Sequence, residues 1–145
     1  MALLDSIKQA LTKSAAAQPS APAATNAAAG RQPEPEPQQV AEIQAAELIP
    51  LYRDGAAPRL LDCREPFEWT QVRIPGSLHI PMNDIPARLG ELDPAAEWVV
   101  VCAHGNRSVA VADYLLRHGL RASSLAGGVT DWWMAGGETE SDYRR

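Results

Sequence analysis

The side chain best suited to nucleophilic chemistry is Cys102, which ends the apolar run WVVVC just before a helical pattern begins. The residues that follow are AHGNRS, in which Gly105 and Asn106 tolerate positive φ and let the chain curl. A curled segment turns its amide N–H groups inward and forms an anion-binding nest, and the following helix adds the positive end of its dipole. A thiol in such a field loses its proton more easily, and the thiolate is the nucleophile. The segment from Cys102 to Ser108 therefore predicts catalysis by a cysteine.

Three residues of this segment could instead have a structural role. A lone Cys102 would be read as a buried core cysteine, but the Gly-Asn-Arg-Ser sequence and the strong helix after it favour function. Arg107 offers a fixed positive charge for an oxyanion, or a structural ion pair with Asp62 or Glu65. His104 either lines the mouth of the pocket or is a solvated loop histidine. No second pair of ligands accompanies Cys102 and His104, so we expect no metal site.

The composition narrows the class of protein. The chain has 145 residues, 46% of them hydrophobic, which suits one domain with a real core. Its net charge of −5 argues against a nucleic-acid binder with a basic surface. Two cysteines exclude a disulfide framework, and no apolar stretch approaches the length of a membrane span. The N-terminus lacks the pattern of a signal peptide. We therefore expect a cytoplasmic protein.

Composition also predicts where the chain divides. Apolar residues at helical spacing indicate a short amphipathic helix over residues 1–14. Residues 15–39 are rich in Ala and Pro and contain no large apolar residue, which is typical of a disordered linker. The folded domain is predicted over residues 40–138, followed by a polar tail over 139–145.

Strands and helices alternate through the predicted domain. This order predicts an α/β fold, an open parallel sheet with helices on both faces. In such a sheet the carboxyl ends of the strands meet at one edge, where ligands bind. Asp62, Cys63 and Arg64 end one strand, Cys102 ends another, and Gly127 and Gly128 follow a third. The predicted strands are 40–43, 59–64, 77–81, 98–102 and 122–128, the last leading into a glycine turn, and the predicted helices are 44–55, 65–72, 83–92, 107–119 and 129–136. Asn83 is the expected N-cap of the helix over residues 83–92. Pro50 should break the first predicted helix or shift its start.

CAHGNRS resembles the active-site loop of the single-domain rhodaneses, a family of sulfurtransferases. Three more segments resemble that family in the same order: LLDCREPFEW, RIPGSLHIP and LAGGVTDWWMAG. The resemblance covers residues 40–138 and implies a rhodanese-like fold. The chain departs from the family pattern at Val72 and Arg73, where Gly-His is frequent, and at Cys63, where Val is usual.

The resemblance implies sulfur transfer rather than phosphate chemistry. Related phosphatases place five residues between the cysteine and the arginine, whereas only Ala103, His104, Gly105 and Asn106 lie between Cys102 and Arg107. The implied reaction forms a Cys102 persulfide from thiosulfate or a similar donor and passes its outer sulfur to a thiol or to cyanide, with no cofactor. The loop from Ala103 to Ser108 would bind the donor. Two other classes stay open, a rhodanese-like binding module with little catalysis and, with less support, a cysteine phosphatase.

The family segment that contains Asp62 and Arg64 looks architectural, a brace for the loop. Cys63 would be a resolving thiol if it lay beside Cys102, because parallel neighbouring strands are about 4.8 Å apart. The alternative, which we favour, is a small buried residue whose side chain points to the other face of the sheet. The implied partners of the active site are a small-molecule sulfur donor and a thiol acceptor, and residues 1–14 could bind a protein partner. No nucleic acid is expected. Membrane binding has little support, because two lysines give weak attraction to anionic lipid.

Overall fold

The computed structural model describes residues 39–143. The helix predicted over 1–14 and nearly all of the linker predicted over 15–39 lie outside these residues. The described part contains a parallel sheet of five strands in the order β1-β5-β4-β2-β3. The strands are β1 Glu42–Ile43, β2 Arg59–Asp62, β3 Leu78–His79, β4 Glu97–Val101 and β5 Arg121–Leu125. The predicted open parallel sheet is thus confirmed.

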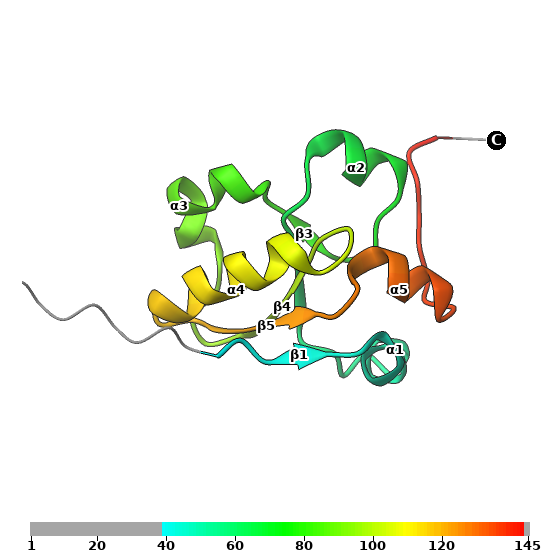
Figure 1. Ribbon diagram of the computed structural model, residues 1–145, viewed down its shortest axis with the longest axis horizontal. Helices are drawn as coiled ribbons and strands as arrows, with labels where there is room; N and C mark the ends of the chain where they lie inside the picture. Colours follow the sequence, from blue (N-terminus) through cyan, green and yellow to red (C-terminus); the bar gives the residue numbers. More distant parts are fainter. Residues whose placement is uncertain (1–38, 144–145) are drawn as a thin grey trace, which may run out of the picture. The chain divides into compact units, whose positions relative to one another are not determined.

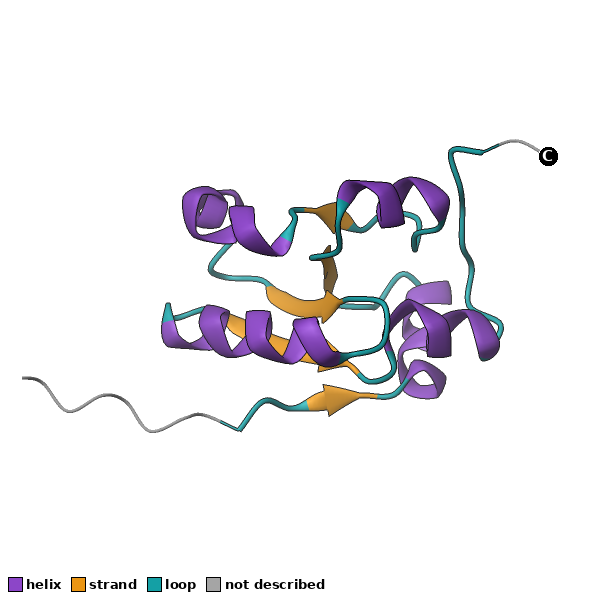
Figure 2. Cartoon of the chain, turned by 45° about the horizontal axis from the view of Figure 1, so that its top comes forward, coloured by secondary structure: helices purple, strands orange, loops and turns teal. Residues whose placement is uncertain are grey.

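Helices cover both faces of the sheet (Figures 1 and 2). The α-helices are α1 Ala45–Arg53, α2 Pro66–Gln71, α3 Ile85–Arg88, α4 Asn106–Arg117 and α5 Gly128–Met134, with 3-10 turns η3 Met82–Asp84 and η4 Leu89–Glu91. On one face, α3 and α4 bury a cluster with alternate residues of β2 and β4. On the other face, α1 and α5 lie side by side and bury the intervening residues (Figure 1).

β4 and α4 carry the cysteine loop between them, and their sequences explain their form. The β-branched run of β4 has Val99, Val100 and Val101 buried, as expected of a central strand with helices on both faces. In α4 the buried residues recur at helical spacing, so that one stripe faces the sheet. They are Ser108, Val111, Ala112 and Leu115. The loop is therefore held at both ends by well-packed elements.

Two predicted helices differ in detail. α1 passes through Pro50 without a break. Pro50 has no N–H to donate to the carbonyl of Ala46, but both residues are exposed, so water can bond to that carbonyl. The single helix predicted over 83–92 is instead the succession η3, α3 and η4. Asn83 lies within η3 and does not cap a helix; Pro86, near the start of α3, already has the φ that a helical turn requires.

Residues that follow α5 are bonded back onto the domain. Arg73 and Glu140 form an antiparallel bridge through two backbone hydrogen bonds of 2.9 Å, and the N–H of Asp142 donates to the carbonyl of Thr70. The guanidinium of Arg73 also pairs with Glu140 at 2.8 Å and Asp142 at 2.6 Å. We call residues 139–142 the C-terminal strap; in Figure 1 it runs past α2. Residues 139–142 of the segment predicted as a polar tail therefore belong to the folded domain.

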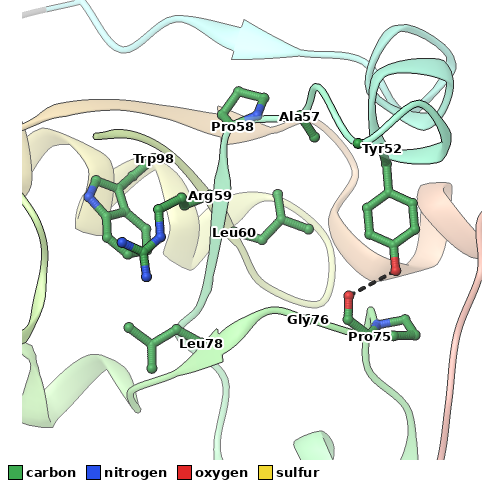
Figure 3. A pocket seen from close by; sticks show the side chains of 10 residues that line it. Tyr52, Ala57, Pro58, Arg59, Leu60, Pro75, Gly76, Leu78 and Trp98 are labelled. Carbon is green, nitrogen blue, oxygen red and sulfur yellow. Dashed lines mark hydrogen bonds between the residues drawn. The ribbon is translucent and has the colours of Figure 1, made fainter. Parts of the chain in front are cut away.

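The two edges of the sheet differ. At the amino ends of β2 and β4 lies a cavity of about 260 Å³, lined at one side by Tyr52 and at the other by Arg59 and Trp98 (Figure 3). The guanidinium of Arg59 stacks there on Trp98, 4.7 Å from the ring centre. At the carboxyl ends lie Asp62, Cys63 and Cys102. Between residues 39 and 143, none of the helices is both long and apolar enough to cross a membrane.

Candidate active site

Three hydrogen-bonding groups surround the sulfur of Cys102. The amide N–H of Gly105 donates to Sγ at 3.0 Å and that of Ser108 at 3.3 Å. The Ser108 hydroxyl oxygen also lies 3.3 Å from Sγ. Cys102 is only 1% exposed, so these groups hold the sulfur within the loop rather than in solvent. The inward-facing amides that the sequence predicts are present.

The pKa of the Cys102 thiol lies below its ordinary value. Burial alone would raise it, since it disfavours the thiolate. The hydrogen bonds to the sulfur outweigh that effect, the largest from the Ser108 hydroxyl, followed by the amides of Ser108, Gly105 and His104. They stabilise the anion because each directs a hydrogen at it. The site therefore favours a nucleophilic thiolate.

The first turn of α5 determines which way the loop's peptide groups point. The N–H of Val129 donates to the carbonyl of Cys102 at 2.8 Å, and that of Thr130 to the carbonyl of Ala103 at 3.2 Å. These bonds hold the first two carbonyls of the loop towards α5, and the amides of Gly105 and Ser108, further along, donate to the sulfur. Gly105, with φ of 95°, completes the curl, and Asn106 is already the first residue of α4. Figure 1 shows the loop beside the start of α5.

Asp62 and Arg64 form a buried ion pair. Arg64 Nη2 lies 2.7 Å from Asp62 Oδ2, and its Nε donates to Oδ1 at 2.9 Å. The remaining guanidinium donors reach the carbonyls of Val72 at 2.7 Å and Glu68 at 3.4 Å. Removing either member would leave the other charge unpaired in the interior. The pair is architectural in its contacts, but what it braces directly is α2 and the residue after it rather than the cysteine loop.

Arg107 is paired with Glu68. Its Nη1 and Nη2 each lie 2.8 Å from one carboxylate oxygen. The alternative of a structural ion pair is therefore realised, though with neither of the expected partners: Asp62 is engaged by Arg64, and Glu65 is exposed at the start of α2. The hydrogen bonds from Arg107 lower the pKa of Glu68 to about 2, and those to Glu68 raise the pKa of Arg107. The arginine keeps its charge beside the loop.

A cavity of about 420 Å³ opens next to the loop. Ala103 and Thr130 line it on the loop side, and Glu68 and Val72 line it from α2 and its end. Trp133 is 64% exposed and forms another wall. His104 is exposed on the loop, with Nδ1 3.3 Å from the Thr130 hydroxyl. A ligand in this cavity would lie beside the cysteine loop.

Cys63 packs in the same buried cluster as Cys102. Asp62 pairs with Val101 in the β2–β4 register, and the Cys63 N–H continues the ladder to the Val101 carbonyl at 3.0 Å. The expectation that its side chain points to the other face of the sheet is therefore wrong. Both cysteines are free thiols. Burial, with the charges of Cys102 and Asp62, raises the pKa of Cys63 to about 12.

These features define an α/β domain with an activated cysteine at the carboxyl edge of a parallel sheet. The model of the rhodanese-like domain family matches residues 44–135, and the chain belongs to this family. It is 35% identical to a sulfurtransferase of Allochromatium vinosum over 64% of this chain and 88% of that protein. It is 34% identical to the thiosulfate sulfurtransferase GlpE of Pseudomonas paraeruginosa, over 66% and 83%.

Solved structures agree with this assignment. A rhodanese-related protein from Thermoplasma volcanium superposes with a TM-score of 0.63 at 34% identity, covering 69% of this chain and 97% of that one. The family and the relatives named as sulfurtransferases support sulfurtransferase activity in general.

Several residues of the site were not singled out in the sequence. Glu68 carries no local signal for its role, since its partner is distant in the chain. Ser124 could have been noticed as a polar residue in a strand expected to be buried; it is fully buried and bonds to Ser108. The amides of Val129 and Thr130 have no side-chain signature at all.

Proposed function

We propose that this chain transfers sulfane sulfur through a persulfide on Cys102, with thiosulfate or a similar compound as donor and a thiol as acceptor. The observation that supports it best is the set of groups around Cys102 Sγ: the amides of Gly105 and Ser108, which donate to it at 3.0 and 3.3 Å, and the Ser108 hydroxyl oxygen 3.3 Å away, which can donate to a thiolate. They suit a sulfur anion as the attacking group and again as the leaving group. GlpE, named as a thiosulfate sulfurtransferase, supports the choice of donor.

The reaction has two halves. In the first, the Cys102 thiolate attacks the outer sulfur of thiosulfate, the S–S bond of thiosulfate breaks, and sulfite leaves with the bonding electron pair. In the second, an acceptor thiolate attacks the outer sulfur of the persulfide, which breaks the new S–S bond and returns Cys102 as a thiolate. Cyanide replaces the thiol as acceptor in an assay and leaves as thiocyanate. Neither half needs an oxidant or a metal.

The other residues take supporting parts. Arg107 presents positive charge beside the loop and would attract the anionic donor, although Glu68 competes for its guanidinium. The cavity lined by Ala103, Thr130 and Trp133 is the entry that we propose for the acceptor. The cell's own acceptor is a small thiol or a protein thiol, and residues 1–14 would serve as contact for such a protein.

The experiment is intact-mass measurement after treatment of the purified chain with thiosulfate. We expect a gain of one sulfur atom, located on Cys102 by peptide mapping, and its loss when cyanide or a thiol is added. Cys102→Ser should show no gain while keeping its thermal unfolding midpoint, because a serine hydroxyl carries no sulfane sulfur. A wild-type chain without the adduct would leave a binding module, and turnover of a chromogenic phosphate ester would indicate a phosphatase.

A further inference from the structure

Two buried hydroxyls lie in line behind the reactive sulfur. Ser124, on β5, has its Oγ 2.7 Å from the Oγ of Ser108, on α4. Ser108 Oγ is in turn 3.3 Å from Cys102 Sγ. Both serines are 0% exposed, so bulk solvent does not reach them, and a buried hydroxyl without a partner is costly.

When Cys102 is a thiolate, only one arrangement of the two hydroxyl hydrogens gives both of them an acceptor in the series Ser124, Ser108, Cys102. The sulfur then has no hydrogen and can only accept. Among the described residues, the Ser124 hydroxyl forms a hydrogen bond with the Ser108 hydroxyl and with no other group. If Ser108 donated to Ser124, the hydrogen of Ser124 would have no acceptor and the sulfur would lose its hydroxyl donor. If Ser124 donates to Ser108, the hydrogen of Ser108 is left for the sulfur, and both hydrogens have acceptors.

We propose that Ser124 is a positioning residue: its hydroxyl donates to Ser108 and so directs the single hydroxyl hydrogen of Ser108 at the sulfur of Cys102. The proposal rests on the proposed function, because the sulfur held in this way is the nucleophile of both half-reactions. Each hydrogen bond in such a chain polarises the next, so Ser108 is also a stronger donor with Ser124 behind it than without it. The importance of the Ser108 hydroxyl agrees with its place as the largest favourable influence on the pKa of Cys102.

Charged and titratable groups also surround Cys102, and substitution of Ser124 leaves them in place. They are Cys63 on the neighbouring strand end, the Arg107–Glu68 pair between α4 and α2, His104 in the loop and the buried Asp62–Arg64 pair. Within residues 39–143, none of these side chains forms a hydrogen bond with the Ser124 hydroxyl. Ser124→Ala removes one oxygen and keeps the backbone bond from its N–H to the Ala41 carbonyl. It therefore isolates the hydroxyl chain.

The test is the pH dependence of Cys102 alkylation by iodoacetamide, followed by mass spectrometry of its peptide. This readout needs no sulfur transfer. We expect Ser108→Ala to raise the midpoint by roughly one pH unit. Ser124→Ala should raise it by about half a unit, a threefold loss of reactive thiolate below the midpoint. Adding Ser124→Ala to Ser108→Ala should cause no further shift, because the chain is already broken at Ser108.

Ser123→Ala is the matched control, since Ser123 precedes Ser124 on β5 and alternate residues of a strand point to opposite faces. It should leave the midpoint unchanged. The proposal is overturned if Ser124→Ala leaves the midpoint unchanged, or if it shifts the midpoint equally when Ser108 is already alanine. If the wild-type chain forms no persulfide, the proposed function fails, and the alkylation result still decides whether Ser124 acts on the sulfur through Ser108.

Discussion

Arg107 and Glu68 meet in a two-pronged ion pair in which both N–O distances are 2.8 Å. One residue lies in the first turn of α4 and the other in α2, so the pair joins the start of α4 to a residue that lines the cavity beside the cysteine loop. An anionic donor that uses the guanidinium must therefore share it with Glu68 or displace it.

Opposite effects are expected from substitutions at the two members of this pair. Arg107→Ala should raise KM for thiosulfate or lower kcat/KM, because the charge is lost. Glu68→Gln should lower KM, because the guanidinium becomes free for the donor. Steady-state kinetics at several thiosulfate concentrations measures both. If the two variants weaken turnover alike, or if Arg107→Ala has no effect, the pair is structural only.

Acid should weaken the same pair in a defined pH window. Because the pKa of Glu68 is lowered to about 2 from 4.5, its contribution to stability is complete above pH 4.5 and is lost as the pH falls towards 2. The pair is partly solvated, so the contribution is roughly 1 kcal/mol or less. The difference in free energy of unfolding between wild type and Glu68→Gln, measured from pH 7 down to 2.5, should shrink only below about pH 4.5. A difference that grows as the pH falls would contradict the assignment.

Cys63 should stay reduced while Cys102 reacts. With a pKa raised to about 12, its thiol is protonated at neutral pH and is a poor nucleophile, even though it shares a cluster with Cys102. After mild peroxide and digestion without reductant, we expect an oxidised Cys102 peptide and a separate Cys63 peptide with a free thiol. A peptide that links the two residues would instead establish Cys63 as a resolving thiol.

Gly128 should be intolerant of any side chain. It has a φ of 62°, and a Cβ there would overlap the carbonyl groups of Cys102 and Ala103. Gly128→Ala should therefore abolish sulfur transfer and lower the unfolding midpoint. Gly119→Ala is the matched control: its φ is 84°, but a Cβ there meets open space, so it should cost only the backbone strain of about 1–2 kcal/mol and keep activity. Equal loss of activity in both variants would show that strain, and not contact with the loop, is responsible.

Removal of residues 1–39 should leave sulfur transfer unchanged. The described site is built from β2, β4, β5, α2, α4 and α5 together with the cysteine loop. Cyanide-dependent turnover of the truncated chain should match that of the full chain within twofold. A large loss would show that the removed segment contributes to the folded enzyme; a loss with a protein acceptor alone would support a docking role for residues 1–14.

The fold was predictable because its signals are local. The β-branched run of β4, the helical spacing in α4 and the glycines after β5 each identify an element without its neighbours. The cysteine loop was equally predictable, since Cys102, Gly105 and Ser108 lie within one short stretch. Where a proline occurred, its effect depended on exposure: Pro50 is accommodated because solvent reaches the carbonyl it leaves unpaired.

The missing parts of the site depend on contacts between distant residues. Arg107 was expected to pair with Asp62 or Glu65, but Arg64 engages Asp62 and Glu65 is exposed at the start of α2, so the partner is Glu68. Arg73, one of the residues that depart from the family pattern, pairs with Glu140 of the C-terminal strap, 67 residues further on. Likewise, Ser124 acquires a role only because β5 places it under Ser108.

The two hydrogen bonds from α5 to the cysteine loop bear on how such a protein could be redesigned. The amides of Val129 and Thr130 donate to the carbonyls of two consecutive residues, Cys102 and Ala103, so the loop and the start of α5 are matched in length. Inserting a residue between Cys102 and Arg107, to give the five-residue spacing implied for the related phosphatases, would displace Gly105, which lies close to the backbone of Gly127. Loop length and the position of α5 would have to change together, and a single insertion should give an unstable chain rather than a new enzyme.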